Sequence, residues 1–190
     1  MNWLFDVLLY LVIPSCSIYI FIRLLFKKKY PINPIVEAIR LLSITYLNYL
    51  IFIVWLMPVA TLNYLRLNLV PLKTIFTYTM DLFQGHINIF VAVTNVIGNI
   101  LITLPLGILL LLSFNKVNKK ILFPVAIGSP IIIEFVQYIL HINNFGTRSV
   151  DIDDVILNFI GIVIGFYLAN LSKEFLVRKK AEIEAYQGKN

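Results

Sequence analysis

Four polar side chains fall at helical spacing inside an apolar segment over residues 121–141. They are Glu134, Gln137, Tyr138 and His141. Offsets of three, four and seven residues place them on one face of a helix. A charged carboxylate inside a bilayer costs on the order of 3 kcal/mol or more unless it is paired or hydrated. Two interpretations stay open: Glu134 faces a water-accessible cavity, or it is a structural acid that locks two helices together.

A second polar stripe lies in the apolar segment over residues 89–113. It consists of Thr94, Asn95, Asn99 and Thr103, again with spacings of four. Asparagine commonly makes hydrogen bonds between membrane helices, so packing is one interpretation. Participation in a site with Glu134 is the other. Pro105 and Gly107 follow, and we expect them to interrupt the helix and leave backbone groups near Leu101 without their usual partners.

A third polar group opens the apolar segment over residues 155–171. Its members are Asp151, Asp153, Asp154 and Asn158. Acidic residues are favoured at a helix N-terminus by the helix dipole, which suits Asp151 and Asp153. Asp154 and Asn158 enter the membrane, so we expect them in a site. Gly161 and Gly165 follow as a G-x-x-x-G pair, which we interpret as helix packing.

Arg148 is the single cation of the loop between the last two apolar segments. Its guanidinium could pair with Glu134 or Asp154, or it could grip a phosphate or carboxylate from outside. The neighbouring carboxylates could in principle hold Ca²⁺ or Mg²⁺. Their spacing is not that of an EF-hand and no histidine pair has metal-ligand spacing, so we expect neither a metal nor a cofactor.

The elements that carry these residues are predicted from hydropathy. Of the 190 residues 59% are hydrophobic, and the mean hydropathy is +0.87. Runs of about 20 apolar residues match a bilayer core. We predict an all-α membrane protein in a single domain over residues 1–190, with a further interfacial or re-entrant helix near 71–84. The five predicted transmembrane helices cover about 3–26, 35–60, 89–113, 121–141 and 155–171.

The basic residues predict the orientation. With the N-terminus outside and the C-terminus in the cytoplasm, only Arg66, Lys73 and Arg148 of the 16 Lys and Arg residues lie outside. This is a strong positive-inside bias. The basic residues flank apolar segments instead of lining a face, which argues against nucleic-acid binding. In this orientation the three polar stripes all lie in the outer half of the membrane and could share one outward-facing cavity.

Several stretches resemble the VanZ-like family of bacterial membrane proteins. They are RLNLVPLKTIFTY, NVIGNILITLPLGILLLL, SPIIIEFVQYIL and TRSVDIDDVILNFIGIVIGFYL, together about residues 66–168. The resemblance implies a bacterial cytoplasmic membrane protein, and the founding member is associated with resistance to the glycopeptide antibiotic teicoplanin. The matching motif positions are Asn99, Pro105, Gly107, Glu134, Gln137, Arg148, Asp151, Asp154, Asn158 and Gly161.

We expect a non-enzymatic protein that binds membrane lipids or an anionic component of the cell envelope, with an effect on glycopeptide susceptibility. Two alternatives stay open: an enzyme acting on an envelope lipid or peptidoglycan precursor, with Glu134 as general acid or base, and a small proton-coupled transporter. No nucleophile is evident and no inverted repeat occurs. The expected ligand-binding residues are Asn99, Glu134, Gln137, Arg148, Asp151, Asp154 and Asn158.

Overall fold

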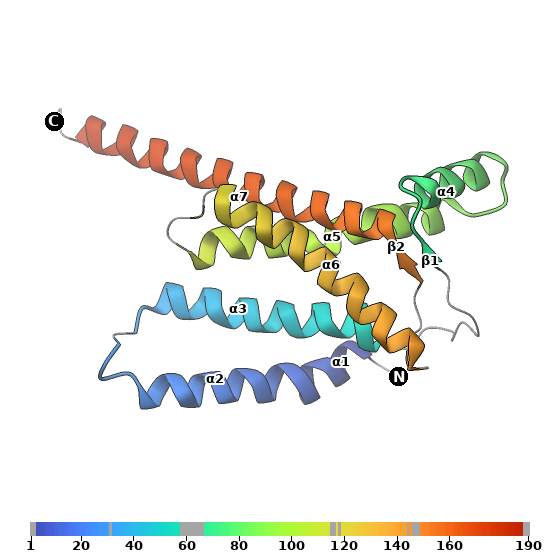
Figure 1. Cartoon of the computed structure of the whole chain (residues 1–190). Helices are drawn as coiled ribbons and strands as arrows, with labels where there is room; N and C mark the ends of the chain where they lie inside the picture. The colour runs from blue at the N-terminus through green and yellow to red at the C-terminus, as the bar shows by residue number, and fades with distance from the viewer. Residues whose placement is uncertain are drawn as a thin grey trace. The chain divides into compact units, whose positions relative to one another are not determined.

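The computed structural model describes residues 3–30, 32–57, 67–114, 117, 119–143, 145 and 149–187. In this part of the chain five helices are long and apolar enough to cross a membrane: Trp3–Leu25, Pro34–Leu56, Ile89–Ser113, Lys120–Ile142 and Ile152–Phe175. The chain is an all-α membrane protein, as predicted (Figure 1). It divides into two compact units, one of residues 1–69 and 131–151 and one of residues 70–130 and 152–190.

The first span of the first unit is a composite helix. It consists of α1 (Trp3–Val7), a π-helical segment η1 (Leu8–Val12) and α2 (Ile13–Leu25). The Ile13 amide donates to the Leu8 carbonyl, five residues back. Pro14 has no amide hydrogen to donate in the next turn. The wider turn accommodates this missing donor, so Pro14 is associated with a π-bulge in this span.

The second span pairs α3 (Pro34–Ile51) with a second π-helical segment, η2 (Phe52–Leu56). The Asn33 side chain begins α3 by accepting from the Ile35 and Val36 amides at 3.0 and 3.3 Å. Met57 is extended, as expected of a residue that precedes a proline. The described helix therefore ends at Leu56, and the last predicted positions, 58–60, lie outside the described residues.

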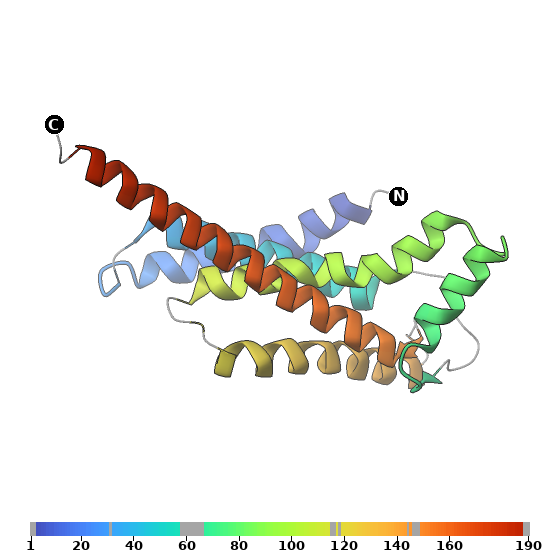
Figure 2. The same ribbon diagram turned by 90° about the horizontal axis from the view of Figure 1, so that it is seen from above.

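α2 and α3 form an antiparallel hairpin, visible in Figures 1 and 2. Polar side chains link them along their length. Asn48 Nδ2 donates to Ser15 Oγ at 2.9 Å, and Cys16 Sγ lies 3.9 Å from Thr45 Oγ1. Nearer the turn, Arg23 Nε donates to Glu37 at 2.7 Å. In hydrocarbon such bonds between helices contribute about 0.6 kcal/mol each, so the hairpin depends on several of them.

Two short strands complete the first unit. β1 (Leu67–Asn68) pairs in parallel with β2 (Val150–Asp151), so that Leu67 faces Val150 and Asn68 faces Asp151. The second half of α6 (Lys119–Ile142) belongs to the same unit. The Trp55 indole donates to the Ile133 carbonyl at 3.3 Å and joins η2 to α6. The strands were not predicted from the sequence.

The second unit contains α4 (Lys73–Phe83), α5 (Ile89–Ser113), the first half of α6 and α7 (Ile152–Gln187). α4 stands where the helix near 71–84 was predicted. The core of this unit comes from three helices and consists of Leu110, Leu111, Leu122, Ala126, Ile162 and Phe166. Removing this apolar surface from water or lipid orders the three helices against one another.

The predicted interruption of α5 is wrong, because the helix runs unbroken from Ile89 to Ser113 with Pro105 inside it. A proline removes one backbone hydrogen bond but does not force a break when packing holds the flanking turns. Gly107, two residues later, lies against α7. A Cβ placed on it would be 2.0 Å from the Ile162 carbonyl oxygen. Gly107 makes this close approach after the proline, and Ile100 and Leu104 make close contacts with α7 before it.

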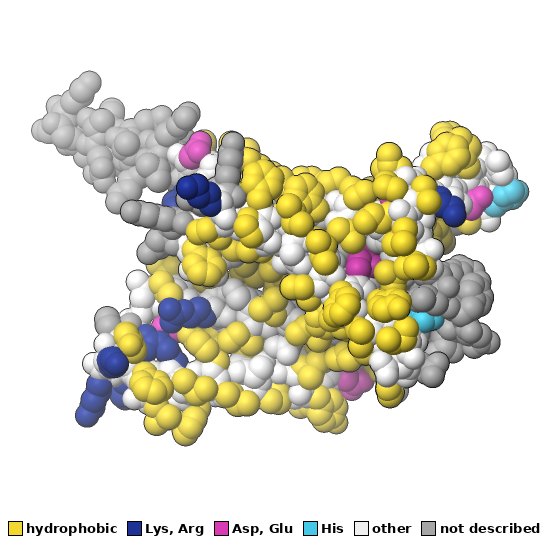
Figure 3. All heavy atoms as spheres, viewed as in Figure 1, with side chains coloured by type: hydrophobic (Ala, Val, Ile, Leu, Met, Phe, Trp, Pro, Cys, Tyr) yellow, Lys and Arg dark blue, Asp and Glu magenta, His cyan; other side chains and the backbone are white. Residues whose placement is uncertain are grey.

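The G-x-x-x-G pair makes the same contact from α7. A Cβ on Gly161 would lie 2.4 Å from the Ile100 carbonyl oxygen, and one on Gly165 would lie 1.9 Å from that of Leu104. The helices cross where these glycines allow the backbones to meet (Figure 2). The interpretation of this motif as helix packing is therefore confirmed. Around the helices, apolar side chains cover most of the visible surface (Figure 3).

Candidate functional site

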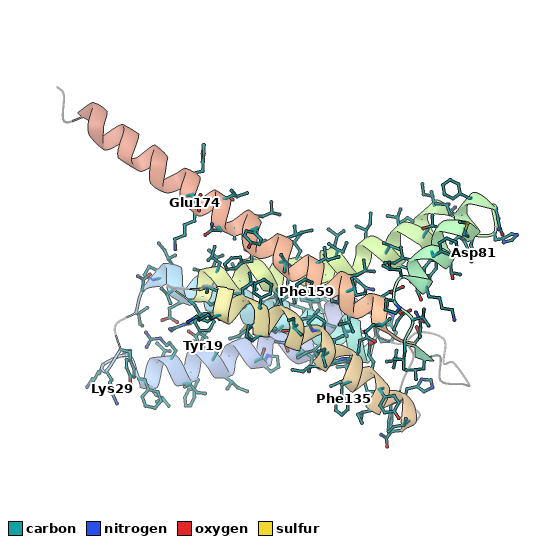
Figure 4. All side chains as sticks on the ribbon, turned by 45° about the horizontal axis from the view of Figure 1, so that its top comes forward. Tyr19, Lys29, Asp81, Phe135, Phe159 and Glu174 are labelled. Carbon is teal, nitrogen blue, oxygen red and sulfur yellow. The ribbon has the colours of Figure 1, made fainter. Side chains whose placement is uncertain are left out.

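Glu134 points into the first unit and not toward lipid. Its side chain is 5% exposed, whereas Phe135, the next residue of α6, is 62% exposed (Figure 4). Adjacent residues of a helix point in directions about 100° apart, so the polar face of α6 is turned inward and the apolar face outward. The Asp151 amide donates to Glu134 Oε2 at 3.0 Å. β2 therefore supplies a backbone donor to the buried carboxylate.

The Asp151 side chain is as buried as that of Glu134, at 5% exposure. Asn68 Nδ2, on the paired strand β1, donates to Asp151 Oδ1 at 2.9 Å. The two-residue parallel ladder sets this contact, because it places Asn68 beside Asp151. Short as it is, the ladder brings together a carboxylate and an amide that are separated by 83 residues.

Gln137 lies one turn beyond Glu134 and is also 5% exposed. Its amide lies between the Glu134 carboxylate and the Val54 carbonyl. With its nitrogen toward Glu134, it donates to both carboxylate oxygens at 2.9 and 3.2 Å. With its nitrogen toward Val54, it donates to that carbonyl at 3.3 Å. The first orientation gives the Glu134 carboxylate a side-chain donor in addition to the Asp151 amide.

The rest of the predicted stripe on α6 is less enclosed. Tyr138 is 36% exposed. His141 is partly buried, and its Nδ1 has no hydrogen-bond partner among the described residues. The buried part of the stripe is therefore the pair Glu134 and Gln137, where the sequence predicted four residues on one face.

A second polar cluster lies in the other unit, between α5 and α7. Asn99 Nδ2 donates to Asp154 Oδ1 at 2.5 Å. One turn deeper, Thr103 Oγ1 is fully buried and lies 3.0 Å from the Asn158 carbonyl oxygen. Asn158 is 4% exposed, and its Oδ1 has no partner in the part of the chain that the structure describes. Thus two side chains of α5 bond across to α7, whereas the buried Asn158 amide oxygen has no partner among the described residues.

Asp153 has a structural role that closes the N-terminus of α4. Its carboxylate accepts from the backbone amides of Leu72, Thr74 and Ile75, the last two at 2.8 and 3.2 Å. An anionic acceptor at this position satisfies amides that a helix start leaves unpaired and interacts favourably with the helix dipole. Leu72 has a φ of 66°, in the left-handed region, and Asp153 fixes it by binding its amide.

These residues fall inside a region that matches known proteins. The model of the VanZ/LLP1 family matches residues 41–173. The chain belongs to the VanZ/LLP1 family. It is also 29% identical over 139 residues to Protein VanZ of Enterococcus faecium, a match that covers 70% of this chain and 76% of that protein. No solved structure matches it.

The VanZ/LLP1 match begins inside α3, at residue 41, whereas the resemblance noted in the sequence begins only at about residue 66. It includes every residue predicted to bind a ligand. Residues 1–40, with all of α2 and the start of α3, lie outside it.

The structure groups the predicted residues of this VanZ/LLP1 chain in two clusters. Glu134, Gln137 and Asp151 meet in the first unit, while Asn99 and Asp154 meet in the second near Asn158. Arg148 lies outside the described residues, as do Gly146 and Arg66. Thr94 and Asn95 join neither cluster, because they bond to carbonyls of their own helix at 2.6 and 2.8 Å.

Reasoning from the sequence missed two contributors to the first cluster, Asn68 and the Val54 carbonyl, and it also missed the α4 amides that Asp153 binds. Each belongs to a contact between positions 78 to 83 residues apart. The sequence signal for Asn68 is weak: one polar residue in the short apolar run LNLV. Among the described residues, no three His, Cys, Asp or Glu side chains lie close enough together to hold a metal ion.

Proposed function

We propose that this protein of the VanZ/LLP1 family binds an anionic component of the cell envelope, or the headgroup of an envelope lipid, at a polar site that opens to the outer face of a bacterial cytoplasmic membrane. In this proposal the protein is not an enzyme. Its binding of an envelope component would change susceptibility to glycopeptide antibiotics, which act on that envelope.

The observation that supports the proposal best is the buried cluster of Glu134, Gln137 and Asp151. Burying ionisable and amide groups in a membrane-spanning helix is costly, so such groups are commonly found at binding sites and ion pathways. Carboxylates and amides accept hydrogen bonds from hydroxyl or ammonium groups of a headgroup. Arg148, in the loop between α6 and β2, would supply the charge-assisted contact to its phosphate or carboxylate.

The proposed orientation has the N-terminus outside and the C-terminus in the cytoplasm. Single cysteines at Ser149 and at Asn118, introduced after Cys16→Ser, test it with a membrane-impermeant thiol reagent on intact cells. We expect labelling at position 149 and none at 118 until the cells are lysed. The opposite pattern would reverse the orientation and put the polar site on the cytoplasmic side.

The binding proposal is tested by lipid analysis of purified protein. The wild type and Arg148→Ala are purified in parallel, and anionic lipids that remain bound are identified by mass spectrometry. Lys73→Ala removes a cation predicted to lie on the same outer side, from the exposed start of α4, and serves as the matched control. We expect one anionic species to be depleted in Arg148→Ala and kept in Lys73→Ala. Equal retention in all three proteins would reject the role of Arg148.

A catalytic role is the second candidate, and the Gln137 amide favours it. A buried carboxyl group with an amide donor beside it is a candidate general acid or base. In that case Glu134→Gln would abolish conversion of an envelope lipid or peptidoglycan precursor while the protein still bound it. Loss of binding itself in Glu134→Gln would support the non-enzymatic proposal instead.

A further inference from the structure

A pocket of about 510 Å³ lies in the first unit, where α2 ends and α3 begins. Its volume is within the range of about 300–1,000 Å³ that small-molecule sites occupy. Nine residues line it, among them the apolar Ile22, Phe26 and Val36 and the charged Arg23, Glu37 and Arg40. All of them precede residue 41, so the pocket is formed by a part of the chain that the family match does not cover.

Charged groups in the pocket are arranged so that one cation is held and another is accessible. Arg23 and Glu37 are 2.7 Å apart, with side chains 13% and 14% exposed, and form the fixed pair. Tyr19 donates its hydroxyl to the other oxygen of Glu37. Arg40 is 3.3 Å from Glu37, but half of its side chain is exposed. The single carboxylate is thus shared by two guanidinium groups, and the pocket carries a net positive charge.

Arg40 retains donors for a ligand. In the described part of the chain each of its hydrogen bonds uses Nη1, to Tyr19 and Glu37. The guanidinium has five N–H donors in a planar fork, so Nε and Nη2 can present two of them to a phosphate. Arg40 lies six residues into α3, about 9 Å along the helix from its start. From the first turns of the helix, the long Arg40 side chain can reach the headgroups by snorkelling.

The remaining walls are apolar, and further positive charge follows directly. Ile22, Phe26 and Val36 present alkyl and aromatic surface to the pocket. Three exposed lysines, Lys27, Lys28 and Lys29, form the turn after α2, and Lys and Arg side chains gather at this end of the hairpin in Figure 3. Figure 4 labels Tyr19 on α2 and Lys29 in the turn that follows it.

We propose that this pocket binds one anionic phospholipid from the leaflet on the side of Lys27, Lys28 and Lys29. Its phosphate contacts Arg40, and its glycerol and first acyl carbons pack against Ile22, Phe26 and Val36. A soluble anion would use the charge but leave the apolar walls exposed, whereas a phospholipid uses both. Under the proposed orientation this is the cytoplasmic leaflet. The site is separate from the outward-facing one and does not depend on its function.

The test is lipid retention by the full chain, measured by native mass spectrometry after transfer from nanodiscs of mixed phosphatidylglycerol and phosphatidylcholine. All proteins carry Arg148→Ala, so that lipid bound at the proposed outer site does not contribute. Arg40→Gln removes the accessible cation. Lys173→Gln removes an exposed cation from α7, on the same predicted side of the membrane, and is the matched control. Val36→Phe fills the apolar wall without changing any charge.

We expect phosphatidylglycerol to be retained over phosphatidylcholine in the parent protein. Arg40→Gln should lower this retention about tenfold, because the loss of one hydrogen bond between charged groups weakens binding by about that factor. Val36→Phe should also lower it, and Lys173→Gln should leave it unchanged. Circular dichroism checks that each variant keeps its helices.

Three results would overturn the proposal. Unchanged phosphatidylglycerol retention in Arg40→Gln would show that Arg40 does not contact the phosphate. An equal loss in Lys173→Gln would show general attraction to a basic surface. Displacement of the phospholipid by glycerol phosphate at equal concentration would show that the pocket takes a soluble anion and that the apolar walls contribute nothing.

Discussion

Replacing Gly165 by alanine should force α7 away from α5. The new Cβ would lie 1.9 Å from the Leu104 carbonyl oxygen and 2.9 Å from its carbon. Real Cβ atoms stay at least 3.0 Å from such neighbours, so the backbones must separate by about 1.1 Å at this point. The obstacle is backbone and not the end of a flexible side chain, so no change of rotamer relieves it.

Two opposing effects set the expected magnitude. Overpacking a tight contact costs about 1–3 kcal/mol, and a gap of about 1 Å forfeits up to half of the dispersion energy around it. Alanine also stabilises a helix interior by about 1 kcal/mol relative to glycine. Taking the upper end of the packing cost, we expect Gly165→Ala to lower the free energy of unfolding by about 2 kcal/mol.

The measurement is unfolding of the purified protein in bicelles by increasing SDS, followed by circular dichroism. Gly98→Ala is the matched control, because Gly98 also lies in a membrane helix and a Cβ there would have no atom within 4 Å. We expect Gly98→Ala to be neutral or stabilising by up to about 1 kcal/mol, which reflects helix propensity alone. If Gly165→Ala and Gly98→Ala have the same free energy of unfolding, close backbone packing between α5 and α7 is refuted.

Further predictions concern the buried polar groups. Asp153→Ala leaves three amides at the start of α4 without their acceptor and should lower the free energy of unfolding by about 3 kcal/mol. As a control, Asp81→Ala removes an exposed ion pair of α4 and should change the free energy of unfolding by less than about 0.5 kcal/mol. Equal effects of the two substitutions would contradict the capping role of Asp153. Glu134→Ala should destabilise by about 2–3 kcal/mol, because the Asp151 amide loses its partner, and Glu134→Gln should recover most of this loss in the same unfolding assay. Asn48→Ala removes one bond between α2 and α3 and should cost less than about 1 kcal/mol; a loss above 2 kcal/mol would show that this bond dominates the hairpin.

The spans could be predicted because hydropathy and length are local properties. The segment predicted at 89–113 coincides with α5, and the polar stripe on α6 was placed on the correct helix. Offsets of three and four residues fix a common face wherever a helix forms. The inward direction of Glu134 follows from the same rule, since Phe135 and its apolar neighbours must face lipid.

Contacts across the chain could not be predicted in this way. The helix dipole was the basis for assigning Asp153 to the start of its own helix, yet the carboxylate caps α4, whose amides lie 78 to 81 residues earlier. The strands β1 and β2 have two residues each, too few to show alternation. Pro105 predicted a break because its local effect is large, but packing around Gly107 keeps α5 continuous.

The cap on α4 has a consequence for biosynthesis. The ribosome makes Leu72 before Asp153, which follows 81 positions later in the chain. At about 5–20 residues per second the delay is roughly 4–16 s. Throughout that interval the amides at the start of α4 lack the acceptor that Asp153 supplies, and Leu72 lacks the contact that fixes its left-handed conformation. Nascent chains arrested before the final span would therefore display an unfinished segment to proteases, and only a chain translated past Asp153 can hide it.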